Sequence, residues 1–284
     1  MDEEKIEEIR QRYSLSYHIS YLLEGEKHVG FKGLRVLEVG GSLPKELVID
    51  QLKCESWIAL EDITYWQELP IDGGGTRPSI SELRRISDIK TMGMMEKEYE
   101  VILGNIDDFP KMIEGYFDRI FSIACFEHIH TLGFSLEKMH RVLKPGGILF
   151  SMFSPIWSAH DGHHLPNITD GKGIVFDFHK SPVPPWGHLL MSPSEMFLFL
   201  KQRTDLETAK KIVYYVYHSP HINRLFTEDY VNYFNNSPFK INKLIPTFQV
   251  QIPANVNDLL RKLYPKNIHF ENNGILVVLK KEIP

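Results

Sequence analysis

The sequence predicts an α/β protein with a doubly wound, mostly parallel sheet. Short apolar runs bounded by turns alternate along the chain with segments whose apolar residues have helical spacing. The runs are apolar on both faces, which is typical of parallel strands covered by helices on either side. Two glycines, Gly40 and Gly41, follow the first run, where a parallel strand would lead into a ligand-binding loop.

The predicted elements follow one another in a regular order. A helical segment is expected within residues 3–24, because apolar and aromatic residues recur there at helical spacing. Strands are expected at 34–40, 56–61, 99–105, 117–125 and 146–154, with an amphipathic helix at 135–144. Three further helices are expected at 192–203, 205–217 and 225–236. The last elements are expected to be a strand near 240–250, a helix near 256–263 and a strand at 274–281.

Residues 155–190 break this rhythm. They are rich in proline and contain five histidines and two tryptophans with little periodicity. A long irregular segment in a compact domain is usually functional or disordered, and the aromatic content argues against disorder. We therefore expect one domain over residues 1–284, with a helical cap at 1–30 and a substrate-side insert at 155–226.

Charge and composition narrow the classes of function. The net charge is −5 and the pI is about 6.2, so no basic excess favours a nucleic-acid partner. Cys54 and Cys125 form no disulfide framework and are expected to be reduced thiols. The acidic start of the chain is not a signal peptide, and no long apolar run predicts a membrane span. A cytoplasmic protein is expected.

Carboxylates at the end of the second strand suggest a nucleoside ligand. Glu61 and Asp62 follow the apolar run 56–61, one βαβ unit after the paired glycines. A carboxylate at that position can accept hydrogen bonds from a ribose diol. The alternative is a plain turn beside ordinary surface carboxylates.

Five motifs in order resemble those of class I S-adenosylmethionine-dependent methyltransferases. The resemblance covers residues 34–152. The motifs are VLEVGG, IALE, GNIDDFP, FDRIFSIACFEHI and RVLKPGGILF. It implies a seven-stranded sheet whose last strand, 274–281, is antiparallel. It also implies S-adenosyl-L-methionine as the cofactor.

The resemblance further implies which residues hold this cofactor. The cofactor-binding residues would be Glu38, Gly40, Gly41, Glu61, Asp62, Asn105, Ile106 and Cys125. The glycines would hold the methionine portion, Glu61 the ribose, and Asn105 with Ile106 the adenine. The chain departs from the family pattern in its loop, which reads Gly-Gly-Ser-Leu-Pro, and in Asn105, which replaces an aspartate. Three N-terminal tyrosines would either cover the cofactor or belong to the core: Tyr13, Tyr17 and Tyr21.

The histidines of the insert are the candidates for methyl-acceptor chemistry. A hydroxyl that attacks a methyl group must lose its proton, and imidazole is a suitable base. The candidate catalytic residues are His160, His163, His164 and His188. They favour an O-methyltransferase of glycan or small-molecule biosynthesis, acting on a hydroxyl of a sugar or related metabolite.

Several alternatives remain open at this stage. The acceptor could be a small amine, or the chain could bind the cofactor as a non-catalytic partner subunit. The histidines could be structural, or His160, Asp161, His163 and His164 could hold a divalent metal, although their spacing matches no standard zinc motif and no metal is expected. We expect a small-molecule acceptor, no nucleic-acid or membrane partner, and allow for a homodimer.

Overall fold

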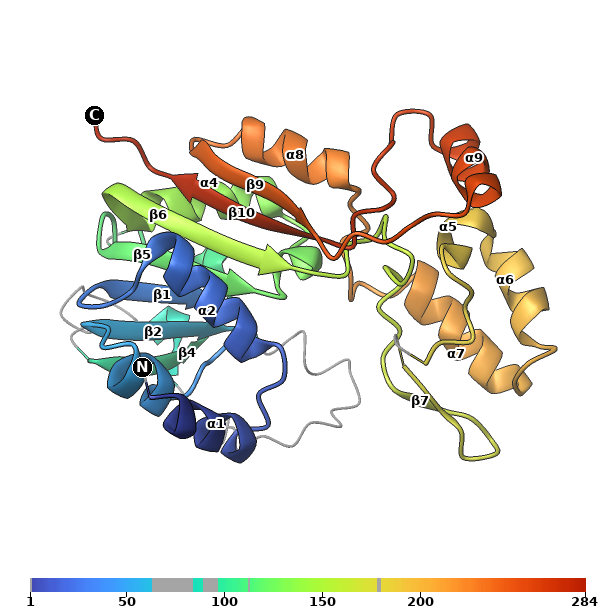
Figure 1. Ribbon diagram of the computed structural model, residues 1–284, viewed down its shortest axis with the longest axis horizontal. Helices are drawn as coiled ribbons and strands as arrows, with labels where there is room; N and C mark the ends of the chain where they lie inside the picture. Colours follow the sequence, from blue (N-terminus) through green and yellow to red (C-terminus); the bar gives the residue numbers. More distant parts are fainter. Residues whose placement is uncertain (1, 63–83, 89–96, 112, 178–179) are drawn as a thin grey trace.

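The centre of the protein is an eight-stranded sheet with the strand order β3-β4-β2-β1-β5-β6-β10-β9 (Figure 1). The computed structural model describes residues 2–62, 84–88, 97–111, 113–177 and 180–284. The strands are β1 (Arg35–Val39), β2 (Ser56–Glu61), β3 (Arg84–Arg85), β4 (Tyr99–Leu103), β5 (Phe117–Ile123), β6 (Leu143–Phe153), β9 (Lys240–Thr247) and β10 (Gly274–Lys280).

Strand direction confirms the predicted fold class. All pairs from β3 to β6 are parallel, whereas β10 runs antiparallel to both β6 and β9. The seven strands from β4 to β9 are the expected sheet, and the two-residue strand β3 extends its edge beyond β4. The carboxyl ends of β1, β2, β4, β5 and β6 therefore lie along one edge, where ligands bind in open α/β sheets.

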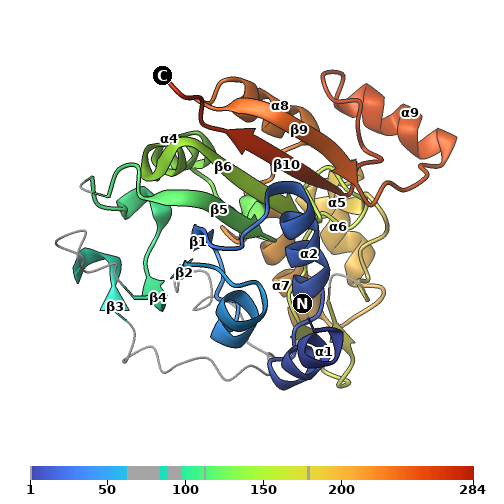
Figure 2. The same cartoon turned by 60° about the vertical axis from the view of Figure 1, so that its left-hand side comes forward.

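Helices cover both faces of this sheet (Figure 2). One face carries α1 (Glu3–Arg12), α2 (His18–Val29) and the π-helical turn η1 (Glu46–Gln51), and the other carries α4 (Leu132–Val142) and α8 (Thr227–Asn235). The single helix expected within residues 3–24 is thus two helices. The break falls where Ser14 has a φ of 51°, a left-handed conformation that an α-helix cannot continue through.

Each face buries its own apolar cluster. Leu132, Leu136 and Met139 of α4 are fully buried against one face, as expected from their helical spacing. On the other face, Phe31 packs edge-on against both Trp57 and Phe121, with ring centroids 5.7 and 5.6 Å apart. These two layers hold the strands in place and so fix the positions of the loops at their ends.

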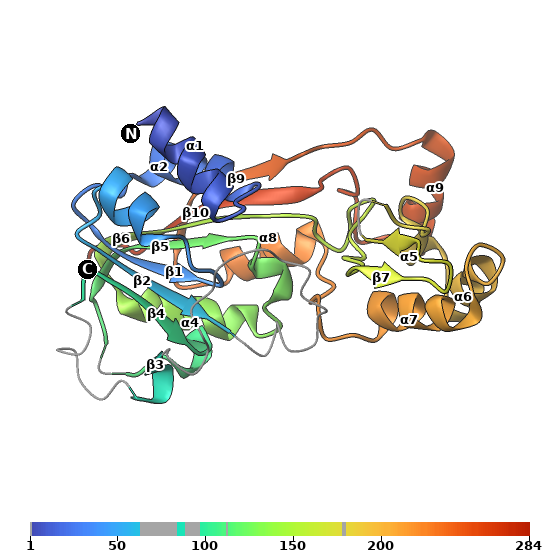
Figure 3. The same cartoon turned by 90° about the horizontal axis from the view of Figure 1, so that it is seen from below.

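The insert forms a third apolar cluster beyond the end of the sheet, where Figures 1 and 3 both show its helices gathered. Its elements are β7 (Ile168–Thr169), β8 (Val175–Phe176), α5 (Gly187–Leu190), α6 (Pro193–Leu200) and α7 (Leu206–Tyr217), and α9 (Ala254–Leu263) joins them from the C-terminal part. Side-chain caps stabilise the starts of two of its helices. The Ser192 hydroxyl caps α6 in a capping box with Glu195, and the Asp205 carboxylate caps α7.

Among the helices that the structure describes, none is long and apolar enough to cross a lipid bilayer.

Candidate functional site

The loop after β1 is pressed closely against the end of β5. Gly40 has a φ of 87°, and its N–H donates to the Leu60 carbonyl at 2.9 Å. A Cβ at Gly40 would overlap the Sγ of Cys125, and one at Gly41 would lie 2.8 Å from Oε1 of Glu38. Both glycines are therefore required by the chain's own packing, which holds the loop backbone at the sheet edge.

Glu38 supports this loop from inside the sheet. Its buried carboxylate accepts the Leu43 N–H at 2.9 Å and the Trp57 Nε1–H at 2.6 Å. Burial raises the pKa of Glu38 to about 7, and the two hydrogen bonds oppose that shift only in part. The described bonds of Glu38 thus position the loop.

Glu61 and Asp62 end β2 as predicted, beside the same loop. The Ser42 hydroxyl donates to Oε1 of Glu61 at 2.7 Å. The Asn105 amide donates to Oδ2 of Asp62 at 2.9 Å, while its Oδ1 accepts the Asp107 N–H at 3.0 Å. Asn105 therefore caps the 3₁₀ turn η5 (Ile106–Asp108). Its side chain also links the end of β4 to the end of β2, through Asp62. Ile106, next to Asn105, is buried.

The chain turns sharply at the end of β5. Ala124 has a φ of 45°, Cys125 follows it, and the 3₁₀ turn η6 (Phe126–His128) begins. Burial raises the pKa of the Cys125 thiol to about 12, so the thiol is neutral and packs against Gly40. Burial also raises the pKa of Glu127 to about 8, because a charged carboxylate is poorly solvated there.

Three side chains meet at this turn: Glu127, His128 and His164. One potential ligand atom from each lies within 4.8 Å of the others. Nδ1 of His128 lies 2.6 Å from the carbonyl oxygen of His221, and the His221 ring packs 5.1 Å from the His128 ring. We call these four residues the histidine cluster.

Burial lowers the pKa of each histidine in this cluster. The pKa falls to about 3 for His128 and to about 4 for His221, and the pKa of His164 lies well below its usual value. Neighbouring imidazoles add to the effect at His128 and His164, because two adjacent positive charges repel one another. All three rings are therefore neutral near pH 7, and each keeps a nitrogen lone pair.

The structure separates the four candidate catalytic histidines. His164 alone among them joins the histidine cluster. His163 and His188 pack together with ring centroids 5.7 Å apart, and Nε2 of His188 lies 2.7 Å from the Trp157 carbonyl oxygen inside the insert. His160 lies beside Asp161, 3.4 Å between Nδ1 and Oδ1. The set His160, Asp161, His163 and His164, considered above for a metal, is thus divided among three surroundings.

The sequence gives little indication that His128 and His221 belong to the histidine cluster. Neither His128 nor His221 is among the candidate residues drawn from the sequence. The motif FEHI at 126–129 was the available signal for His128. No local pattern marks His221, which reaches the site from a segment 93 residues further along the chain.

The N-terminal tyrosines have three different surroundings. Tyr13 donates to Glu46 at 2.9 Å, and Tyr17 is exposed and stacks on His18. The Tyr21 hydroxyl lies 2.9 Å from the Ser154 hydroxyl, at the end of β6 and on the same sheet edge as the histidine cluster.

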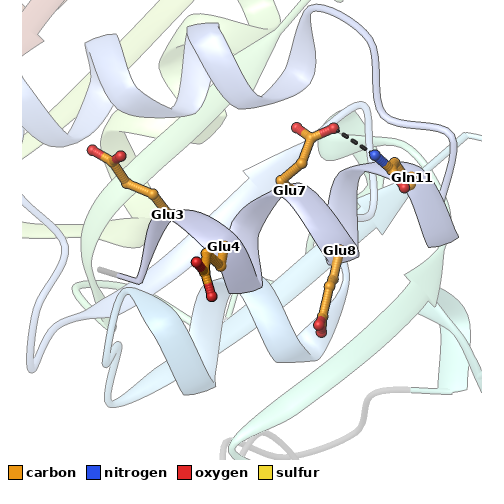
Figure 4. A pocket seen from close by; sticks show the side chains of 5 residues that line it. All are labelled: Glu3, Glu4, Glu7, Glu8 and Gln11. Carbon is orange, nitrogen blue, oxygen red and sulfur yellow. Dashed lines mark hydrogen bonds between the residues drawn. The ribbon is translucent and has the colours of Figure 1, made fainter.

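A separate hollow lies on the outer side of α1 (Figure 4). It is lined by Glu3, Glu4, Glu7, Glu8 and Gln11, and Glu7 accepts a hydrogen bond from Gln11 at 2.8 Å. The glutamates lie on the solvated side of a surface helix, so the strand ends are the better candidate for chemistry.

Comparison with known proteins agrees with this geometry. Residues 84–151 match the family model described as a methyltransferase domain. A search of curated proteins found no match. The strand order is that of the class I methyltransferase fold, and the segment that matches the family model contains the third, fourth and fifth motifs described above.

Solved structures resemble the chain only distantly. A methyltransferase chain from the Haloferax volcanii complex with the Trm112 methyltransferase activator is 12% identical (TM-score 0.46; 99% of this chain and 95% of that chain). An S-adenosylmethionine-dependent methyltransferase from Mesorhizobium loti is 13% identical (0.45; 94% and 99%). Geranyl diphosphate C-methyltransferase from Streptomyces coelicolor A3(2) is 8% identical (0.45; 93% and 78%).

Proposed function

We propose that the protein transfers a methyl group from S-adenosylmethionine to a hydroxyl group of a small polar molecule, a sugar or a related metabolite. One observation carries the proposal. Cys125 packs against Gly40 of the β1 loop, and Glu127, two residues further on, belongs to the histidine cluster. The predicted cofactor loop and a group of neutral imidazoles are thus neighbours on one sheet edge.

The residues at the ends of β1, β2 and β4 fit a nucleoside with an attached amino acid. Glu61 offers a carboxylate for the ribose hydroxyls, and Ser42 holds one of its oxygens at 2.7 Å. The backbone around Gly40 and Gly41 can approach the methionine portion closely because neither residue has a side chain. Glu38 and Asn105 take supporting roles, since their described bonds hold the loops themselves.

The histidine cluster supplies the proton acceptor. S-adenosylmethionine provides an electrophilic methyl group on a positively charged sulfur. The acceptor oxygen forms the new bond to this carbon, the carbon–sulfur bond breaks with its electron pair going to sulfur, and the hydroxyl proton passes to an imidazole nitrogen. Burial keeps the cluster's imidazoles neutral near pH 7, so a nitrogen lone pair is available for that proton, although the lowered pKa makes each ring a weaker base than a free imidazole.

Turnover of acceptor candidates tests the proposal. The full chain would be incubated with S-adenosylmethionine and a panel of sugars, sugar nucleotides and small amines, and S-adenosylhomocysteine formation would be measured. We expect acceptor-dependent product with a hydroxyl compound. His164→Gln should lower turnover by about 10²–10⁴-fold while cofactor affinity stays nearly constant. His269→Gln, an exposed histidine beside Glu271, is the matched control.

Each other result has a definite meaning. Methylation of amines alone would identify an N-methyltransferase. Cofactor binding without turnover of any acceptor would support a non-catalytic partner subunit. Full turnover by the folded His164→Gln variant would show that this histidine is not the proton acceptor.

A further inference from the structure

We propose that Glu127, His128 and His164 form a binding site for one divalent transition-metal ion, with zinc the best-fitting class. This inference departs from the expectation drawn from residue spacing, under which no metal was predicted. It rests on the proposed function only for the role of the ion: with the ion bound, His164 is a ligand and not the proton acceptor. Binding itself can be tested without turnover.

The donor set is the first argument. Two imidazole nitrogens and one carboxylate oxygen lie within 4.8 Å of one another. Two histidines and one carboxylate, with further positions left for a substrate or water, are a recurrent set for catalytic zinc and for non-haem iron. Nitrogen donors argue against magnesium and calcium, which prefer oxygen ligands.

The state of Glu127 is the second argument. Glu127 is 1% exposed, and the donors nearest its carboxylate, the backbone N–H groups of Glu127 and Ser154, do not reach good hydrogen-bond geometry with it. A buried polar group without partners costs free energy, so such groups usually have a reason to be retained. A bound cation would satisfy both oxygens and the buried charge together.

The orientation of His128 is the third argument. Its Nδ1 lies 2.6 Å from the carbonyl oxygen of His221. A proton on Nδ1 donates to that oxygen, which leaves Nε2 as the nitrogen with a lone pair. Histidines that bind metals commonly have this arrangement, because the outer hydrogen bond fixes the tautomer and the ring plane.

The spacing is compatible with a single ion. Ligand atoms around tetrahedral zinc lie about 3.3 Å apart, since each is about 2.0–2.1 Å from the metal. The three ligand atoms here all lie within 4.8 Å of one another, so any adjustment on binding is small. A metal held there lies on the same sheet edge as the β1 loop, where it can bind the acceptor hydroxyl and lower its pKa.

Cobalt(II) is the direct probe, because its visible absorption reports ligand type and number. The full chain would be stripped with a chelator and titrated with Co²⁺ and then with competing Zn²⁺ or Mg²⁺. We expect one Co²⁺ per chain, displaced by Zn²⁺ and not by Mg²⁺. Glu127→Gln and His164→Gln should each weaken binding at least about 10-fold, whereas His269→Gln should leave it unchanged.

Absence of cobalt bands in the wild-type protein, or bands that persist in both folded variants, would overturn the proposal. If the variants fail to fold, X-ray absorption of the zinc-loaded wild-type chain decides: two imidazoles and oxygen support the site, and any other ligand set overturns it. Cofactor affinity of the metal-free chain, measured by calorimetry, tests the proposed function separately. Failure there would leave the metal site standing, and the reverse also holds.

Discussion

The two halves of the sheet edge are built in different ways. The half proposed to bind the cofactor (the cofactor half), at the ends of β1, β2 and β4, contains carboxylates that accept hydrogen bonds from neighbouring residues, such as Glu61 from Ser42. The half proposed to bind the methyl acceptor (the acceptor half), at the ends of β5 and β6 with the insert, contains half-buried neutral histidines around Glu127. The hydrogen bonds described for the first half join residues 19 and 43 positions apart in the sequence, whereas the second half brings together residues 93 positions apart.

The two halves should therefore differ in their sensitivity to substitution and to pH. In the cofactor half, close packing fixes the backbone positions of the β1 loop. In the acceptor half, burial of the titratable rings disfavours their protonated forms, so each ring is kept neutral.

The largest effect is expected at Gly40, in the cofactor half. Gly40→Ala adds a Cβ that overlaps Cys125 in a left-handed backbone conformation, so both strain and overpacking oppose it. We expect a loss of about 2–6 kcal/mol in the free energy of unfolding, measured by urea denaturation. Gly115→Ala is the control, since its φ of 61° is similar but no atom lies near the new Cβ. Equal losses would show that the contact with Cys125 is unimportant.

A pH effect is expected from His188, in the insert. Burial lowers its pKa from 6.5 to about 4, so the folded state binds fewer protons than the unfolded state between these values. The stability contributed by its neutral form is present above about pH 6.5 and is lost as the pH falls toward 4. The loss is on the order of 3 kcal/mol.

His188→Gln tests this by comparison of urea midpoints at several pH values. Glutamine can still donate to the Trp157 carbonyl that Nε2 of His188 meets at 2.7 Å. The wild-type protein should lose more stability than the variant on acidification. Parallel curves for the two proteins would contradict the expectation.

Cofactor affinity should fall by a smaller amount at Glu61. Glu61→Ala removes the carboxylate proposed to bind the ribose hydroxyls, and a hydrogen bond to a charged group contributes about 1.5–3 kcal/mol. Calorimetry with S-adenosylhomocysteine measures the change. Glu98→Ala, an exposed glutamate paired with Lys45, should have no effect. Unchanged affinity in folded Glu61→Ala would remove this residue from the site.

The smallest effect is expected at Ser192, which begins α6 of the insert. Ser192→Ala removes the cap and the hydrogen bond to Glu195, so the free energy of unfolding should fall by about 1 kcal/mol. Thermal unfolding measures this change. Cofactor affinity should remain that of the wild type, because the cap lies outside the cofactor half. A change in affinity would show that the two halves are coupled.

Much of the fold could be predicted because its signals are local. The run 56–61 was expected as a strand and is β2, and residues 274–281 contain the antiparallel strand β10. Glu61 and Gly40 lie at the expected strand ends for the same reason. The break between α1 and α2 was missed because helical spacing continues across Ser14, whose backbone conformation the pattern does not show.

The histidine cluster could be predicted only in part. His164 and its neighbours His160 and His163 are close in sequence, yet the chain places them in different surroundings. His164 has a φ of 45°, a left-handed backbone conformation. Which imidazole meets Glu127 depends on this backbone turn and on packing against His221, and neither is visible in the spacing of the residues.

The closure of the insert by the C-terminal part has a consequence for synthesis of the chain. The Trp186 indole donates to the Phe270 carbonyl at 3.2 Å, 84 residues later, and α9 packs against α5. Strand β10 also inserts between β6 and β9, which are made before it. On the ribosome, both the insert and the edge of β6 must therefore wait for the last strand, and during that interval unpaired backbone and apolar surface are exposed to chaperones.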